Sequence, residues 1–130
     1  VPLEAEHAAK WRAACTVYDE RGRQVARYDK LHLFDVNLIE SNEQFVESEN
    51  IEPGDRVVVI DSPVGRLGIS VCYDLRFPEI FRTAAVRGAE VFTVIANWPK
   101  ARSAHWTALL QAYKVPNPFP APPYRRSYLS

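Results

Sequence analysis

The segment from residue 65 to residue 98 constrains the fold of this chain more than any other part. It reads GRLGISVCYDLRFPEIFRTAAVRGAEVFTVIANW. An apolar, β-branched run predicts a strand over residues 66–71, Pro78 suits the first turn of a helix, and Gly88 suits its end. The nearly continuous apolar run at 90–96 is typical of a strand covered on both faces of a sheet. Strand, helix and strand in this order predict an α/β domain.

The remaining periodicity predicts a strand-rich first half and a second helix. Two β-favouring segments flank a turn-like cluster that contains Gly22, which predicts a hairpin. A stretch rich in Glu, Asn and Ser shows neither the helix nor the strand period, and its end, Pro-Gly-Asp, is typical of a long surface loop. The predicted elements are the hairpin strands 14–18 and 24–28, the loop 37–55, a strand 57–61, a tight turn 62–65 and a helix 103–113.

Composition narrows the class of protein. The chain has 130 residues, 47% of them apolar, which suffices for one packed domain. Sixteen basic residues balance sixteen acidic ones, so no charge footprint favours nucleic acid or a membrane surface. The apolar runs are too short to span a bilayer, and the N-terminus has no signal-peptide pattern. Cys15 and Cys72 are therefore expected to be reduced thiols in a cytoplasmic protein.

The last segment, 114–130, differs from the rest. It reads KVPNPFPAPPYRRSYLS and holds five of the ten prolines, so an interior helix or a central strand is excluded and an extended or disordered tail is expected. The chain is thus divided into a domain 1–113 and a Pro-rich tail 114–130. The motif from Pro120 to Arg125 fits a ligand of SH3-type grooves, so an interaction module is one possible function.

Cys72 stands where a predicted strand ends and a turn toward a helix begins. A nucleophile at this place is held rigidly by the strand and lifted clear of the sheet by the turn, and a helix N-terminus nearby favours an anion. The alternative is a small buried apolar residue. Position alone favours the alternative, because such turns occur in every α/β domain.

A second segment, RYDKLHLFDV, places Lys30 just after a predicted strand among aromatic and apolar residues. An ammonium group in a partly desolvated site would stabilise a thiolate and the charge that develops on a carbonyl oxygen under attack. A lysine exposed to solvent is the alternative.

YDKLHLFDV and GISVCYDLRFPE together resemble the carbon-nitrogen hydrolase (nitrilase-like) superfamily, and within it the Nit-type ω-amidase-like branch. The similarity runs from Pro2 to about Ala112 and includes ESENIEPGD and AHWTALLQA. The resemblance implies an α-β-β-α sandwich, here a partial one. It also implies hydrolysis of a non-peptide carbon-nitrogen bond by a Glu-Lys-Cys set without metal or organic cofactor.

By position in the motifs, the resemblance assigns Cys72 as the nucleophile and Lys30 as the group that stabilises the oxyanion. Glu47 matches a second glutamate that orients Lys30 and the substrate, and the backbone N–H of Tyr73 would help to bind the oxyanion. The implied reaction passes through a thioester and releases ammonia from a small linear amide. Family members usually form dimers through the sandwich, so a homodimer is possible.

The sequence also departs from the family pattern. The family's upstream catalytic glutamate is not found here, since Glu4 and Glu6 match no such motif, and the Pro-rich tail replaces the family's later strands. With Val1 in place of a methionine, these departures are expected of a fragment whose activity is impaired. A catalytically dead scaffold that presents the Pro-rich ligand is the alternative function.

Other combinations of residues are weaker. His32 or His105 paired with Cys72, with Asn97 as orienter, would resemble a cysteine protease, but no local signature of such enzymes is present. His32 is instead expected to support its loop, and His105 to cap or pack near Trp106. The cysteines and histidines show no metal-ligand spacing, and the scattered glycines form no phosphate-binding loop.

Two further groups of side chains follow Cys72 in the sequence. Asp74, Arg76 and Glu79 would form an ion network that braces the turn, or else a solvated helix start. Trp98 and Trp106 would line the mouth of a pocket, or else belong to the core or to an interface.

Overall fold

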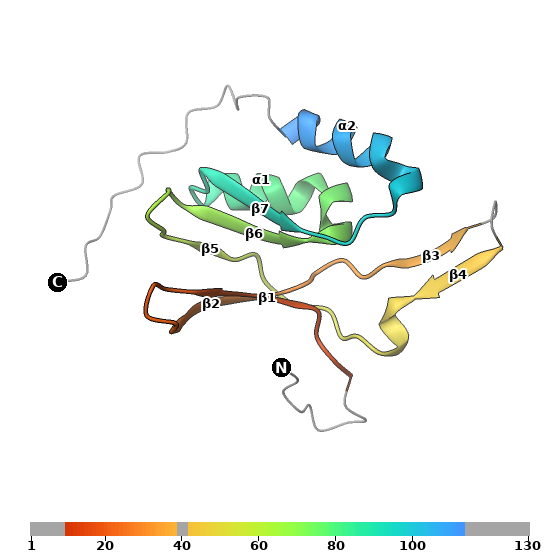
Figure 1. The fold of residues 1–130 in the computed structure, drawn as a ribbon, viewed down its shortest axis with the longest axis horizontal. Helices are drawn as coiled ribbons and strands as arrows, with labels where there is room; N and C mark the ends of the chain where they lie inside the picture. Colours follow the sequence, from red (N-terminus) through yellow and green to blue (C-terminus); the bar gives the residue numbers. More distant parts are fainter. Residues whose placement is uncertain (1–9, 39–41, 114–130) are drawn as a thin grey trace.

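The computed structural model describes residues 10–38 and 42–113 (Figure 1). Glu4, Glu6 and the whole Pro-rich tail, with its SH3-type motif, lie outside the described residues. The strands are β1 (Ala14–Tyr18), β2 (Gln24–Asp29), β3 (Asp35–Leu38), β4 (Glu43–Val46), β5 (Val59–Ile60), β6 (Leu67–Val71) and β7 (Val91–Ile95). The helices are α1 (Pro78–Val86) and α2 (Ser103–Tyr113), with short 3-10 helices η1 (Glu47–Glu49), η2 (Cys72–Arg76) and η3 (Lys100–Arg102).

The first two strands form the predicted antiparallel hairpin. Asp19 closes its turn by accepting backbone hydrogen bonds from Arg21 and Arg23, both 2.9 Å long. Gly22 has a φ of 74°, a conformation that costs glycine little. The turn chemistry read from the sequence is therefore confirmed.

The predicted long loop 37–55 is wrong in its first part. β3 and β4 pair antiparallel there and form a second hairpin, which is followed by η1. Figure 1 shows this hairpin extending away from the rest of the described chain. Its strands are short and largely exposed, with Phe45 at 43% exposure. No described side chain of these strands is fully buried, and β4, whose sequence is EQFV, lacks the apolar alternation that predicts a strand.

The central sheet has the order β5-β6-β7, antiparallel between β5 and β6 and parallel between β6 and β7. The strand predicted at 57–61 is paired only at Val59 and Ile60, whereas β6 and β7 match their predictions to within one residue at each end. β7 was expected to be covered on both faces. This is wrong in the described residues, because Val91 and Ile95 are 39% and 46% exposed.

Both predicted helices are present. α1 begins at Pro78, as the missing N–H of proline favours, and Gly88 follows its end with a φ of 87°. α2 covers the predicted range. α1 makes the crossover between the parallel strands β6 and β7.

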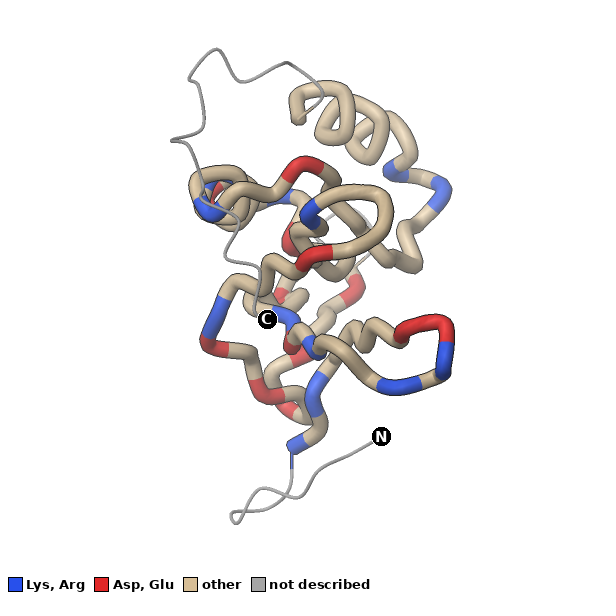
Figure 2. The backbone as a smooth tube through the Cα atoms, turned by 90° about the vertical axis from the view of Figure 1, so that its left-hand side faces the viewer, with Lys and Arg blue, Asp and Glu red and all other residues tan. Residues whose placement is uncertain are grey.

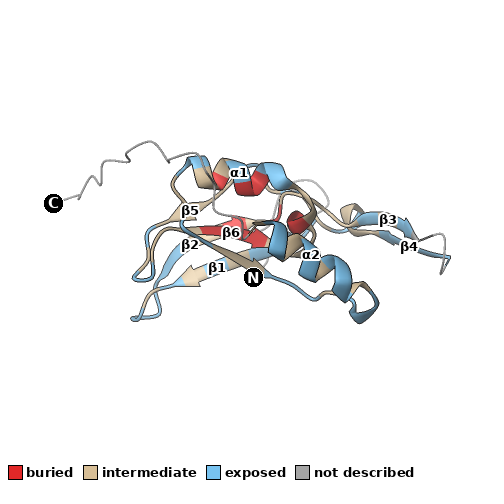
Figure 3. Cartoon of the chain, turned by 90° about the horizontal axis from the view of Figure 1, so that it is seen from above, coloured by how far each residue is buried: buried red, intermediate tan, exposed pale blue. Residues whose placement is uncertain are grey.

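The core lies between α1, β6 and the β1-β2 hairpin. Its buried apolar residues are Tyr28, Ile69, Leu75, Ile80 and Phe81. Figure 3 shows the buried residues concentrated on α1 and β6. Partly buried side chains from β1 and α2, such as Val17 and Leu110, pack around this cluster. The core thus fixes the carboxyl end of β6, where Cys72 follows.

Figure 2 shows charges of both signs distributed over the described chain. The Arg21–Glu20 and Arg56–Asp55 pairs join exposed side chains, whereas Asp19, which pairs with Arg23 at 2.7 Å, has only 13% of its side chain exposed. Among residues 10–38 and 42–113, no helix is long and apolar enough to cross a membrane.

Candidate active site

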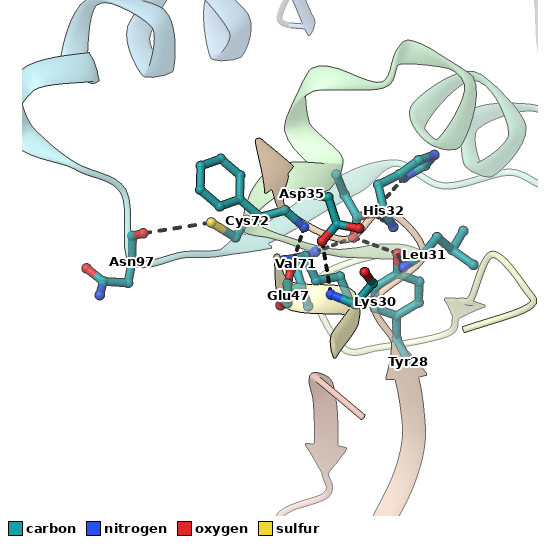
Figure 4. Close-up of polar contacts among 12 residues, drawn as sticks. Tyr28, Lys30, Leu31, His32, Asp35, Glu47, Val71, Cys72 and Asn97 are labelled. Carbon is teal, nitrogen blue, oxygen red and sulfur yellow. Dashed lines mark hydrogen bonds and ion pairs between the residues drawn. The ribbon is translucent and has the colours of Figure 1, made fainter. Parts of the chain in front are cut away.

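Cys72 follows the last residue of β6 and opens η2. Its φ is 48°, in the left-handed region that residues other than glycine rarely adopt. The thiol is partly exposed, and its S–H donates to the backbone carbonyl oxygen of Asn97 at 3.8 Å (Figure 4). The predicted turn at the end of a strand is confirmed. An α-helix does not start at the sulfur, however, because η2 precedes α1.

Lys30 follows β2 and is buried, with 5% of its side chain exposed. Its Nζ lies 2.6 Å from Oε2 of Glu47. The backbone is held on both sides, since the N–H of Lys30 donates to the carbonyl of Ala13 and its carbonyl accepts from Gly54, both at 2.8 Å. The expected desolvated ammonium is present, and the alternative of a solvated lysine is wrong.

Glu47 opens η1, after the second hairpin. Its Oε2 accepts both the Lys30 ammonium and the backbone N–H of Phe34, each at 2.6 Å. Its side chain is 22% exposed, so the pair stands at the border between the interior and solvent. The resemblance paired Glu47 with Lys30, and the structure places the two side chains in contact.

Aromatic contacts connect the Lys30–Glu47 pair to the Cys72 turn. The ring of Phe34, whose N–H binds Glu47, lies 5.0 Å from the ring of Tyr73 in an edge-to-face arrangement. Tyr73 is the residue after Cys72, and its ring also meets that of Phe77 at 5.4 Å. Figure 4 shows Lys30 and Glu47 together, and Cys72, from a third segment, with its sulfur pointing toward Asn97.

Asp74 forms a second connection, which the sequence did not reveal. The residue is fully buried, and its two carboxylate oxygens accept hydrogen bonds from Tyr28, His32 and Val71. Burial, and next the hydrogen bond to Asp74, raise the pKa of Tyr28 far above its ordinary range. The partners are 42 and 46 residues away for His32 and Tyr28, so no local pattern could have indicated them.

The predicted ion network of Asp74, Arg76 and Glu79 is wrong for the described residues. Asp74 turns toward Tyr28 and His32, whereas a guanidinium nitrogen of Arg76 lies 3.2 Å from Nδ1 of His105. The same guanidinium stacks over Trp98, 5.1 Å from the ring centre.

The histidines do not form a protease-like pair with Cys72. His32 supports its loop as predicted, through Nδ1 at 2.8 Å from Asp74, and stacks on Phe77 at 3.8 Å. His105 contacts Arg76. Asn97 meets the thiol through its backbone carbonyl and not through its side chain. Within the described residues, neither imidazole is hydrogen-bonded to the sulfur.

Trp98 and Trp106 pack against each other, with ring centres 5.2 Å apart. Trp98 also donates its indole N–H to the carbonyl of Arg102 at 2.9 Å, and both rings pack against the core. The interpretation as core residues is therefore the one that the contacts favour.

Other features of the described residues carry no catalytic group. Residues 10–38 and 42–113 contain no group of three or more His, Cys, Asp or Glu that would hold a metal ion. An open hollow of about 470 Å³ is lined by Val57, Val58, Val59, Arg66, Val86 and Arg87. None of the residues assigned to catalysis lines it, so it is separate from the site at Cys72.

Fold and site together define a class of protein: an α/β domain with a cysteine in a left-handed turn and a buried lysine–glutamate pair. Residues 2–126 match the carbon-nitrogen hydrolase family, and the chain belongs to this family. The fold of its structural neighbours is that of the nitrilase superfamily, with mixed helices and strands.

The relatives include amidases of the Nit type. The chain is 44% identical over 102 residues to the deaminated glutathione amidase of Yersinia enterocolitica, covering 78% of this chain and 36% of that protein. It is 34% identical over 116 residues to the omega-amidase NIT2 of Homo sapiens, covering 88% of this chain and 42% of that protein. The chain thus spans about two fifths or less of the length of these relatives.

Solved structures give the same result. Nit3 of Saccharomyces cerevisiae, a member of branch 10 of the nitrilase superfamily, superposes with a TM-score of 0.69 at 26% identity, over 87% of this chain and 38% of that one. The NitFhit protein of C. elegans superposes with a TM-score of 0.72 at 36% identity, over 80% of this chain and 26% of that one. An amidase mutant from Nesterenkonia sp. AN1, with acrylamide added at the active-site cysteine, has a TM-score of 0.65 at 28% identity, over 77% of this chain and 36% of that one.

Proposed function

We propose that the chain carries the nucleophile, the oxyanion cation and the orienting carboxylate of an amidase, and that Cys72 attacks small linear amides. The observation that carries this proposal is the buried Lys30–Glu47 pair, which Phe34 connects to the turn that opens with Cys72. A buried cation near a cysteine in a left-handed turn would stabilise the negative charge that develops on a carbonyl oxygen when the thiolate attacks.

The proposed reaction begins with the thiolate of Cys72 attacking the amide carbonyl carbon. A carbon-sulfur bond forms, and the carbonyl electron pair moves to oxygen, where the Lys30 ammonium and the backbone N–H of Tyr73 stabilise it. Collapse of the tetrahedral intermediate breaks the carbon-nitrogen bond, and the proton that the Cys72 thiol gave up passes through water to the nitrogen, which leaves as ammonia. Water then attacks the thioester and releases the carboxylic acid.

Glu47 is proposed to orient Lys30 and not to transfer the protons. Its Oε2 already accepts hydrogen bonds from the ammonium and from Phe34. The proton transfers are the role of the family's upstream glutamate, for which neither Glu4 nor Glu6 is proposed. We therefore expect formation of the thioester and slow turnover.

The substrate class is proposed from the relatives, whose names are those of amidases. Amides are accordingly preferred to nitriles as substrates. The proposal includes the partial α-β-β-α sandwich over residues 1–113, association into a homodimer, and action without a cofactor. The two free cysteines, Cys15 and Cys72, support a cytoplasmic location.

Labelling with iodoacetamide at pH 7.5 tests the nucleophile, with Cys15 as the internal control. Burial raises the pKa of the Cys15 thiol, so this residue should react slowly. Peptide mapping by mass spectrometry should show Cys72 alkylated about tenfold faster or more. Equal, slow labelling of the two cysteines would contradict the proposal.

Intact-mass measurement after incubation with a panel of small linear amides tests the chemistry directly. The expected adduct has the mass of the amide minus ammonia, appears together with free ammonia, and is absent in Cys72→Ser. Cys15→Ser is the matched control and should retain the adduct. Failure of every amide to form an adduct on a folded chain whose Cys72 labels rapidly would limit the proposal to a reactive thiol without amidase chemistry.

A further inference from the structure

The carboxylate of Asp74 accepts four hydrogen bonds in the interior of the protein, where its exposure is 0%. Oδ2 accepts from the hydroxyl of Tyr28 at 2.6 Å and from the backbone N–H of Val71 at 2.9 Å. Oδ1 accepts from the backbone N–H of His32 at 3.0 Å and from its Nδ1 at 2.8 Å. Each carboxylate oxygen thus accepts two hydrogen bonds.

The donors lie on both sides of Lys30 and immediately before Cys72. Tyr28 and His32 stand two residues before and two residues after Lys30, and Val71 precedes Cys72. The Tyr28 hydroxyl also accepts the backbone N–H of Leu31 at 3.2 Å, which closes the turn around Lys30. One carboxylate therefore bridges the two segments that carry the ammonium and the thiol.

The Cys72 turn needs such support because its backbone is strained. A φ of 48° at a residue other than glycine persists only where the surroundings hold it. Asp74 holds the turn at its start through the N–H of Val71, and its own carbonyl accepts the N–H of Phe77 at 2.9 Å near its end.

We propose that Asp74 is the positioning residue that fixes the Lys30 segment against the Cys72 turn, so that ammonium and sulfur face the same substrate carbonyl. The inference rests on the proposed function of Lys30 and Cys72. Asp74 does not touch the substrate in this account. It acts through the two segments that it joins.

A carboxylate is required because two of the donors are backbone N–H groups, which can only donate and cannot accept a hydrogen bond. In Asp74→Asn, the side chain has one acceptor oxygen and one NH₂ group. Whichever way the amide turns, its NH₂ faces the N–H of either Val71 or His32. One of the two segments then loses its connection, although the side chain keeps its size.

A double-mutant cycle on the full chain tests this role, with the iodoacetamide labelling rate of Cys72 as the readout. The first arm, Lys30→Met, should lower the rate at least about fivefold, since it removes the cation that stabilises the thiolate. The second arm, Asp74→Asn, should lower it to a similar extent. In the Asp74→Asn background, Lys30→Met should then change the rate less than about twofold, because the two groups are no longer held together.

The outcomes separate this inference from the proposed function. No effect of Lys30→Met in the otherwise unchanged chain would refute the proposed function itself. A full effect of Lys30→Met in both backgrounds would overturn only the role of Asp74, because a purely structural residue leaves the two changes additive. Asp61→Asn, at an aspartate with 89% side-chain exposure, is the matched control and should leave the cycle unchanged.

Folding of each variant is followed by the far-UV circular dichroism and by the Cys15 labelling rate, which rises if the chain unfolds. If Asp74→Asn does not fold, Tyr28→Phe replaces it in the cycle, since it removes one of the four hydrogen bonds. Partial loss of the Lys30→Met effect in that background supports the inference. An undiminished effect overturns it.

Discussion

The left-handed backbone at Cys72 predicts an inverted order of stability between two substitutions. At ordinary positions alanine is more stable than glycine by about 0.5–1 kcal/mol, because glycine loses more backbone entropy on folding. At a φ of 48° the Cβ atom costs about 1–2 kcal/mol, which alanine bears and glycine avoids. Both substitutions remove the sulfur and its contact with Asn97, so this loss cancels in the comparison. Cys72→Gly should therefore be more stable than Cys72→Ala by about 1 kcal/mol.

Urea unfolding followed by tryptophan fluorescence measures this difference, and a thermal scan should show about 4 °C between the two midpoints. Ala108→Gly, at an exposed position of α2, is the control and should have the opposite sign, a loss of about 1 kcal/mol. If Cys72→Ala proves equal to or more stable than Cys72→Gly, the turn does not hold the nucleophile in a strained conformation, and the structural argument for its exposure is refuted.

Three further predictions concern the support of the site. Gly54→Ala should lower the free energy of unfolding by about 1–3 kcal/mol, measured in urea, because a Cβ there would lie against the carbonyl of Asp29, well inside contact distance. The pKa of Tyr28 is raised from its ordinary value of 10.0, so its contribution to stability is complete below pH 10 and is lost as the pH rises further. Tyr28→Phe should therefore reduce the fall of the unfolding midpoint between pH 10 and pH 11. An unchanged dependence of the midpoint on pH would contradict this. Glu47→Gln should lower the free energy of unfolding by about 1–2 kcal/mol, since it leaves the buried lysine without its counter-charge. Glu49→Gln, at an exposed residue of η1, is the control and should change the free energy of unfolding little. Equal losses in both variants would count against a special role of the Lys30–Glu47 pair.

The local elements that sequence patterns predicted best are those whose signals are short in range. Pro78 and Gly88 delimit α1 because proline and glycine act through their own backbone. The hairpin of β3 and β4 was missed because it lies apart from the core, and β4 has no apolar alternation that would predict its strand. The exposure of Val91 and Ile95 was also missed, because an apolar side chain favours burial but does not show which element, if any, covers it.

In the candidate site, too, the sequence indicated local features and not the long-range contacts. The motifs around Lys30 and Cys72, together with the family resemblance, identified both residues and paired Glu47 with Lys30. They did not reveal that Asp74 turns away from its neighbour Arg76 and toward Tyr28 and His32.

By itself, the sequence determined the order of strand, turn and helix that presents Cys72, because this order depends on residues within a few positions of each other. Only the tertiary structure decided which carboxylate meets which donor. Asp74 and Tyr28 are 46 residues apart, and a hydrogen bond between them exists only once β2 and β6 are packed around one core. Burial then removes water as a competing partner, so the buried carboxylate must find its donors within the protein.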